Sequence, residues 1–132
     1  MIPRFEGTGR LGAAPEMKTI GSGDDAKQLV TFTCYFEGRV KTGDGYADKY
    51  GYWREVEIWK DGLGKRVHEL LEKGMMVRVE GVQLCDKYEK DGEQRERHKI
   101  RAEDVFVDLI GIQEIVRKPK AQEQGQDTAE AA

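Results

Sequence analysis

Hydrophobic and polar residues alternate along several short stretches of the chain, which is the pattern of β-strands with one buried face. The clearest case is residues 28–37, where Val30, Phe32, Cys34 and Phe36 fall on one face. Other stretches of this character give predicted strands at residues 4–11, 52–60, 75–84 and 95–107. Glycine and aspartate cluster between them, as expected of turns.

One segment has helical spacing instead. After residue 61, Val67, Leu70 and Leu71 form one apolar stripe, and Lys73-Gly74 supplies a basic last turn and a stop. The pattern therefore predicts a single helix between the third and fourth strands.

The connections complete the predicted topology. Residues 40–51 are glycine-rich and polar, which favours a mobile hairpin loop, and residues 86–92 contain an Asp-Gly turn signal. Gly81 predicts a bulge or bend in the fourth strand. The resulting order predicts an all-β fold with one helix, namely a five-stranded oligonucleotide/oligosaccharide-binding (OB-fold) barrel.

Two of the predicted strands have contrasting faces. In the third strand Val56 and Ile58 share one face, whereas Trp53 and Trp59 share the other. In the fifth strand, the face opposite the apolar residues carries the cations Arg95, Arg97, Lys99 and Arg101. The polar faces of these strands therefore combine aromatic surface with positive charge.

Composition limits what these faces can do. Charged residues make up 36% of the chain and the net charge is −3, so the protein as a whole is not a basic nucleic-acid binder. Phosphate binding would require cations gathered on one face. Neither an apolar run of membrane-spanning length nor a signal peptide is recognisable, so we expect a cytoplasmic protein with no membrane partner.

Candidate chemistry for catalysis is absent from the sequence pattern. Cys34 and Cys85 lack the spacing of a zinc site, and we interpret both as buried thiols. His68 and His98 have no cysteine or carboxylate at ligand spacing in the sequence. We therefore expect no metal, no cofactor and no enzymatic activity.

Five short blocks, taken in order, resemble the bacterial single-stranded-DNA-binding protein family. The blocks are RLGAAPE at 10–16, YWREVEIW at 52–59, LLEKG leading to VRVEG at 70–81, YEKDG at 88–92 and IRAEDV at 100–105. The resemblance implies an OB-fold domain over residues 1–110, followed by a short extension and tail over 111–132. The Lys-Pro-Lys sequence and the Ala, Gln, Glu and Gly residues beyond residue 117 cannot bury enough surface to fold, so we expect residues 118–132 to be disordered. It also implies binding and protection of single-stranded DNA in replication, recombination or repair, by a homo-oligomer (dimer or tetramer).

The sequence also departs from the family pattern. Glu55 and Glu57 bring negative charge to the third strand, and the family's stacking aromatic after the second strand is missing, so that Tyr35, Tyr46 or Tyr50 would have to substitute. The acidic, phenylalanine-ended tip that recruits replication partners is missing too, so we expect no partners of that kind. A plasmid-, phage- or mobile-element-type relative would fit these losses.

Sequence-tolerant binding of single strands requires aromatic rings for bases and cations for phosphates. The predicted stacking residues are Trp53, Trp59 and Tyr88. The predicted phosphate-binding residues are Arg10, Arg54, Arg78, Lys87, Arg95, Arg97, Lys99 and Arg101.

Several alternatives stay open at this point. The tryptophans could pack under the helix or at a subunit contact, and the cations could be a solvated face paired with Glu89, Glu93 and Glu96. A protein-interaction adaptor of the primosome type would bind protein with the tryptophan face. A small nuclease would need a carboxylate cluster that the sequence does not display.

Overall fold

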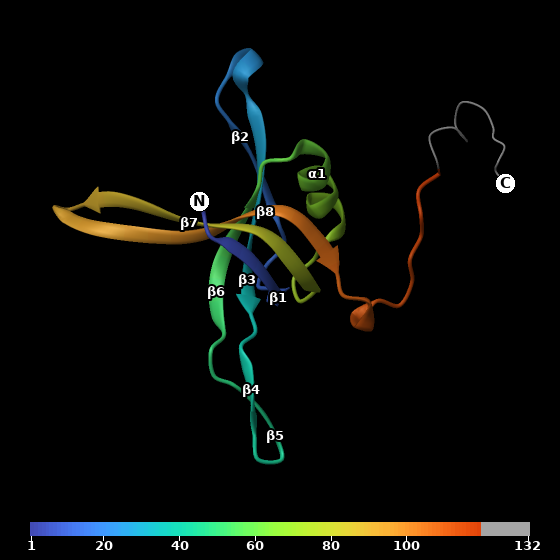
Figure 1. Ribbon diagram of the computed structural model, residues 1–132. Helices are drawn as coiled ribbons and strands as arrows, with labels where there is room; N and C mark the ends of the chain where they lie inside the picture. Colours follow the sequence, from blue (N-terminus) through green and yellow to red (C-terminus); the bar gives the residue numbers. More distant parts are fainter. Residues whose placement is uncertain (120–132) are drawn as a thin grey trace.

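The barrel is a ring of five strands that closes on itself (Figure 1). The computed structural model describes residues 1–119. Its elements are β1 (Arg4–Leu11), β2 (Glu16–Ile20), η1 (Gly23–Asp25), β3 (Lys27–Phe36), β4 (Arg39–Thr42), β5 (Gly45–Asp48), β6 (Tyr52–Ile58), α1 (Asp61–Leu70), β7 (Met76–Lys90), β8 (Glu93–Val107) and η2 (Leu109–Gly111). The ring runs β1-β7-β8-β6-β3 and returns to β1. The predicted OB-fold, with a helix between the third and fourth barrel strands, is confirmed.

The alternation of hydrophobic residues gives the core its lining. The predicted inward residues of β3 are all buried, and the same holds for Val77 and Val79 of β7 and for Ile100 and Ala102 of β8. Successive side chains of a strand point to opposite sides, so the side chains between these core residues point outward and form the barrel's outer layer. Two of them, Thr31 and Glu57, are nevertheless buried by their neighbours.

Helix α1 covers one part of this core with a narrower stripe than predicted. Val67 and Leu71 are buried, but Leu70 is 55% exposed, so its place on the predicted stripe is wrong. The helix ends at Leu70, and Gly74 adopts the left-handed conformation (φ 90°) further along the chain. None of the helices within residues 1–119 is long and apolar enough to cross a membrane.

Three extensions project from the barrel, namely the β7–β8 ribbon, the β4–β5 hairpin and the hairpin of β2 and β3 (Figure 1). β7 and β8 are 15 residues each and continue as a two-stranded ribbon, so most of the hairpin predicted at 86–92 is strand. Only Asp91 and Gly92 form the turn, both with positive φ (55° and 81°), as a two-residue hairpin requires. The predicted loop at 40–51 is the β4–β5 hairpin.

Two local features qualify the sequence-based assignment of strands. β2 was not predicted; it pairs with β3 but exposes every residue, so it has no buried face for a hydrophobic pattern to report. The bend predicted at Gly81 is confirmed by a register shift between Glu80 and Gly81.

Of the predicted disordered tail at 118–132, residues 120–132 lie outside the described part of the chain.

Candidate nucleic-acid interface

Three neighbouring strands present a continuous outer surface, which we call the β3–β6–β8 face. β6 lies between β3, its antiparallel partner, and β8, its parallel partner. The face consists of the outward residues Thr31, Thr33, Tyr35, Trp53, Glu55, Glu57, Arg97, Lys99 and Arg101. Aromatic residues occupy one end of this surface, and charged residues with two threonines occupy the remainder.

The aromatic end is built from Trp53 and Tyr35, which lie directly across from each other on β6 and β3. Their rings meet edge to face, with centroids 5.3 Å apart and planes inclined at 63°. Trp53 is 56% exposed although Val56 and Ile58 of the same strand are fully buried. Gly12 lies beneath the indole, since an added Cβ would come within 2.6 Å of it. The sequence prediction that Trp53 points away from the core is confirmed.

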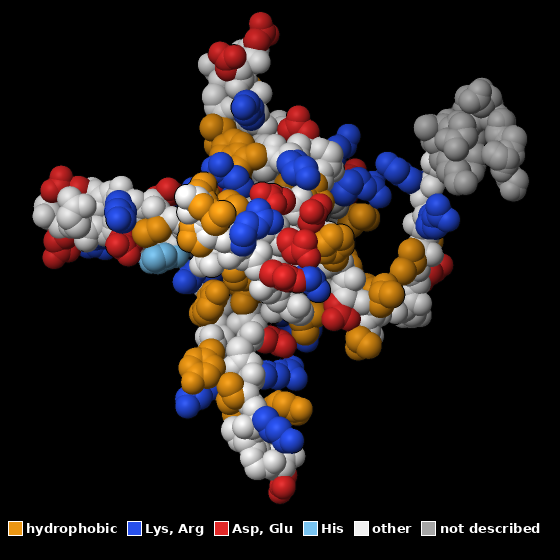
Figure 2. Space-filling view, viewed as in Figure 1, with side chains coloured by type: hydrophobic (Ala, Val, Ile, Leu, Met, Phe, Trp, Pro, Cys, Tyr) orange, Lys and Arg blue, Asp and Glu red, His pale blue; other side chains and the backbone are white. Residues whose placement is uncertain are grey.

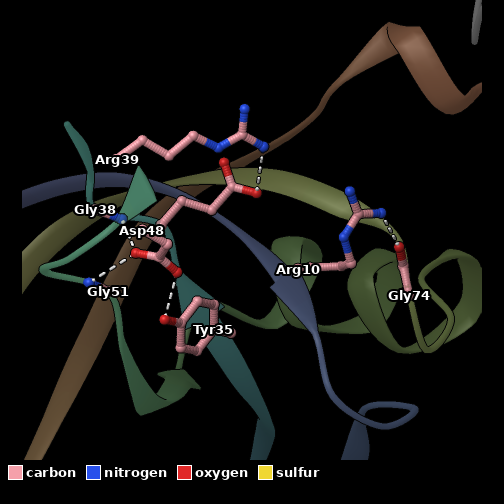
Figure 3. A network of polar contacts seen from close by, with 8 residues as sticks. Arg10, Tyr35, Gly38, Arg39, Asp48, Gly51 and Gly74 are labelled. Carbon is pink, nitrogen blue, oxygen red and sulfur yellow. Dashed lines mark hydrogen bonds and ion pairs between the residues drawn. The ribbon is translucent and has the colours of Figure 1, made fainter. Parts of the chain in front are cut away.

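Asp48 holds the hydroxyl of Tyr35 in place (Figure 3). The Tyr35 hydroxyl donates to Asp48 Oδ2 at 2.5 Å, while the backbone N–H groups of Gly38 and Gly51 donate to Oδ1 at 3.1 and 3.0 Å. These hydrogen bonds lower the pKa of Asp48, with the Tyr35 hydroxyl as the largest cause, and raise the pKa of Tyr35. Asp48 thus joins the base of the β4–β5 hairpin to the aromatic end of the face.

Replacing Asp48 with asparagine should loosen this arrangement, because the neutral amide is a weaker acceptor for the tyrosine hydroxyl. The raised pKa of Tyr35 should then fall toward the ordinary tyrosine value, which NMR of ring-labelled tyrosine would detect. In the parent protein the stabilisation due to Asp48 should be full above the ordinary carboxyl pKa and should be lost as the pH falls through the lowered one. An unchanged Tyr35 titration in Asp48→Asn would show that the hydrogen bond does not orient the ring.

Carboxylates of β6 neutralise much of the cationic row on β8. Glu57 is only 4% exposed, and its carboxylate lies 3.2 Å from Lys99 Nζ and 3.1 Å from Arg101 Nε. Glu55 pairs with Arg97. Because Glu55 lies across from Lys99 and Glu57 across from Arg101 in the parallel register, each cation has an acidic neighbour.

Further acidic partners come from the ribbon itself. Asp86 lies 2.9 Å from Lys99 Nζ, and this hydrogen bond lowers the pKa of Asp86 and raises that of Lys99. Glu93 pairs with Arg95 at 3.3 Å. The cations of β8 are therefore paired with carboxylates, as the alternative interpretation of the sequence expected. Of the carboxylates expected as partners, Glu89, Glu93 and Glu96, only Glu93 pairs with one of these cations. The other partners are Glu55, Glu57 and Asp86.

The ribbon carries more of the predicted residues. Tyr88 lies directly across from Arg95 and is 44% exposed, on the same side of the ribbon as Arg97. Lys87 lies across from Glu96 and points to the other side. Tyr88 and Arg95 therefore extend the β3–β6–β8 face, whereas Lys87 does not.

The remaining predicted residues occupy other positions. Arg54 alternates to the side opposite Trp53 and stacks over the ring of Tyr52, 4.4 Å from its centroid. Arg78 is bound between Glu6 and Glu80 on β1 and β7. Neither residue joins the face.

Arg10 and Trp59 lie at the margins of the face. Arg10 is across from Tyr35 on β1, and its guanidinium donates to the carbonyl of Gly74 at 2.9 Å (Figure 3). Trp59 is partly buried, and its Nε1 has no hydrogen-bond partner within residues 1–119. The guanidinium of Arg101 lies 6.0 Å from the Trp59 ring. Trp59 is thus a less accessible stacking surface than Trp53.

Basic and acidic side chains are interspersed over the visible surface rather than segregated, and the hairpin and ribbon carry both signs along their lengths, with acidic side chains at their ends (Figure 2). The exposed ring of Trp53, with Tyr35 beside it, therefore distinguishes this face more clearly than net positive charge does. Sequence reasoning included Tyr35 only as a substitute aromatic and did not identify Asp48. The alternation along β3 places Tyr35 on the outward side, so the sequence could have indicated its role. No local sequence pattern indicates the role of Asp48.

Comparison with known proteins gives two concordant results. A model of the single-strand binding protein family matches residues 4–108. Among solved structures, the chain is similar to a small single-stranded DNA-binding protein from Streptomyces coelicolor, with a TM-score of 0.70, 17% identity and coverage of 83% of this chain and 96% of that one. It is also similar to a Plasmodium falciparum SSB in complex with ssDNA, with a TM-score of 0.66, 18% identity and coverage of 81% and 95%.

Proposed function

We propose, from the premise that the chain belongs to the single-strand binding protein family, that it binds single-stranded DNA on the β3–β6–β8 face by stacking bases on Trp53 and Tyr35. The observation that carries the proposal is the exposed ring of Trp53 packed edge to face against the partly exposed ring of Tyr35, on two strands whose opposite faces line the core. Every base has a face that can stack, so such a pair binds without reading sequence.

Electrostatics should have a secondary part in this binding. Arg97, Lys99 and Arg101 already have carboxylate partners, so phosphates must compete with Glu55 and Glu57 for them. Counterion release then contributes less than it would with free cations. Stacking supplies a larger share of the affinity than in a strongly basic protein.

The ribbon and the β4–β5 hairpin extend the binding surface. Tyr88 and Arg95 continue the face along the ribbon, and Tyr46 of the hairpin is 70% exposed. These two extensions point away from the barrel in different directions (Figure 1), so together they can follow a strand longer than the barrel is wide. The protein would then protect single strands during replication, recombination or repair, without catalysing a reaction on them.

A homo-oligomer, either a dimer or a tetramer, is part of the proposal. Met17 and Ile20 expose apolar surface on β2, whose outer edge lies at the end of the sheet order. An unpaired strand edge offers free backbone N–H and C=O groups with which a strand of another chain can pair. Sedimentation at micromolar concentration that detects monomer alone would remove this part of the proposal.

Titration of a labelled oligo-dT with the protein, followed by fluorescence anisotropy at several salt concentrations, tests the function. We expect tight binding to oligo-dT, much weaker binding to duplex DNA, and a salt slope shallower than the value of about −2.8 that four unpaired cations would give. Equal affinity for duplex would contradict the proposal. Undetectable binding to both would favour a protein-interaction adaptor.

A further inference from the structure

The ribbon of β7 and β8 leaves the barrel at the pair formed by Cys85 and His98. Every residue from Cys85 to His98 is exposed, whereas Ile100 is buried in the core. Cys85 was expected to be a buried thiol, and that expectation is wrong. It lies directly across from His98, which is distant in sequence, so spacing along the chain could not reveal the pairing.

A third polar group joins this pair. Glu96 lies two residues before His98 on β8, so its side chain points to the same side of the ribbon. The Cys85 sulfur, a nitrogen of His98 and a carboxylate oxygen of Glu96 all lie within 4.8 Å of one another. Tyr88 and Arg95 are on the other side, so this cluster is separate from the β3–β6–β8 face.

From this geometry we propose that Cys85, Glu96 and His98 bind a zinc ion at the root of the ribbon. His98 Nε2 and Glu96 Oε1 are 3.3 Å apart. Two ligands of one tetrahedral zinc ion, with nitrogen and oxygen each about 2.1 Å from the metal, are separated by about 3.4 Å. The sulfur lies within 4.8 Å of both atoms, so it needs to approach by at most about 1.2 Å, which rotation of an exposed side chain supplies.

The donor set selects the class of metal. A thiolate, an imidazole and a carboxylate together suit zinc rather than magnesium or calcium, which prefer oxygen ligands alone. Three protein ligands leave a fourth position for water. On binding, the Cys85 thiol releases its proton to solvent and coordinates as the thiolate, so the charge of the ligands offsets that of the ion. Lys87, across from Glu96, is the cationic neighbour that opposes binding.

The metal would stabilise an element that has little other support. A two-stranded ribbon without a covered face is only marginally stable in water. A bridge between Cys85 of β7 and His98 of β8 would join the strands where they leave the barrel and so fix the direction of the ribbon. This role is independent of the DNA-binding proposal, because neither the metal nor its ligands would contact the bases.

Cobalt(II) titration of the full chain, in a buffer with a thiol-free reductant, tests the proposal. We expect one cobalt ion per chain, a thiolate-to-metal charge-transfer band in the near ultraviolet, and displacement of the cobalt by zinc. Burial raises the pKa of the Cys34 thiol to about 12, so the band would report Cys85. Cys85→Ser should abolish it, and His98→Gln should weaken binding by at least about tenfold.

Matched variants separate this site from incidental binding. His68→Gln removes the exposed histidine of α1, and Glu93→Gln removes a carboxylate from the other side of the ribbon. Both variants should bind cobalt as the parent protein does. Circular dichroism would verify that all four variants are folded. The proposal is overturned by equal cobalt binding in Cys85→Ser, by half an ion per chain with metal-dependent dimerisation, or by no binding at the protein concentration used.

Discussion

Replacing Trp53 with alanine is expected to weaken binding of oligo-dT by about 1–3 kcal/mol while leaving the protein folded. The loss should be large because the indole offers an open π surface beside Tyr35 on the β3–β6–β8 face. The fold should survive because the core residues of β6 point to the opposite side of the strand. Anisotropy titrations with oligo-dT and thermal denaturation measure the two quantities separately.

Two further variants make this result specific. Tyr46→Ala removes an exposed ring from the β4–β5 hairpin and should cost less affinity than Trp53→Ala. Arg97→Ala should reduce affinity modestly and change the salt slope by less than about 0.7, because Arg97 is paired with Glu55. If Trp53→Ala unfolds the protein, or if its affinity equals that of the parent, the tryptophan serves packing rather than DNA.

Glu57→Gln is expected to lower the free energy of unfolding by about 1–3 kcal/mol and to make DNA binding more sensitive to salt. Glu57 is buried between Lys99 and Arg101, and the neutral amide would leave Arg101 without its carboxylate partner and Lys99 with Asp86 alone. The stability cost follows from weakened charge-assisted hydrogen bonds. The steeper salt slope follows because Arg101 becomes available to phosphates and Lys99 has one competing carboxylate fewer.

Urea denaturation and salt-dependent titrations of the same variant provide the measurements. Glu89→Gln, which removes an exposed carboxylate from the ribbon, serves as the control and should change neither the stability nor the slope appreciably. A Glu57→Gln protein with parental stability and slope would mean that the buried ion pairs neither support the barrel nor restrain its cations.

The sequence predicted those parts of the fold in which one face of an element is buried. Alternation identified β3, β6 and the inner halves of β7 and β8, because each side chain there is either core or surface. It did not identify β2 or the outer part of the ribbon, since strands with two exposed faces have no such pattern to detect. It also placed Leu70 in the core, where only three-dimensional packing could show otherwise.

For the site, the residues that make up the face could be predicted from the sequence, but their pairing across strands could not. The row of cations on β8 was visible, yet its neutralisation by β6 depends on a parallel register between strands distant in the sequence. The roles of Asp48 and of the Cys85–His98 pair arise in the same way, from contacts between segments that no local motif connects. Cross-strand neighbours decide these interactions, and they follow only from the closed barrel.

The fluorescence of Trp53 alone, measured in a Trp59→Phe protein during titration with oligo-dT, tests the central claim most directly. Trp53 is then the single tryptophan of the chain, so its emission reports the aromatic end of the β3–β6–β8 face and nothing else. If bases stack on this ring, the emission should be strongly quenched with the same midpoint as binding measured by anisotropy. Full binding by anisotropy without a change in Trp53 emission would contradict the account.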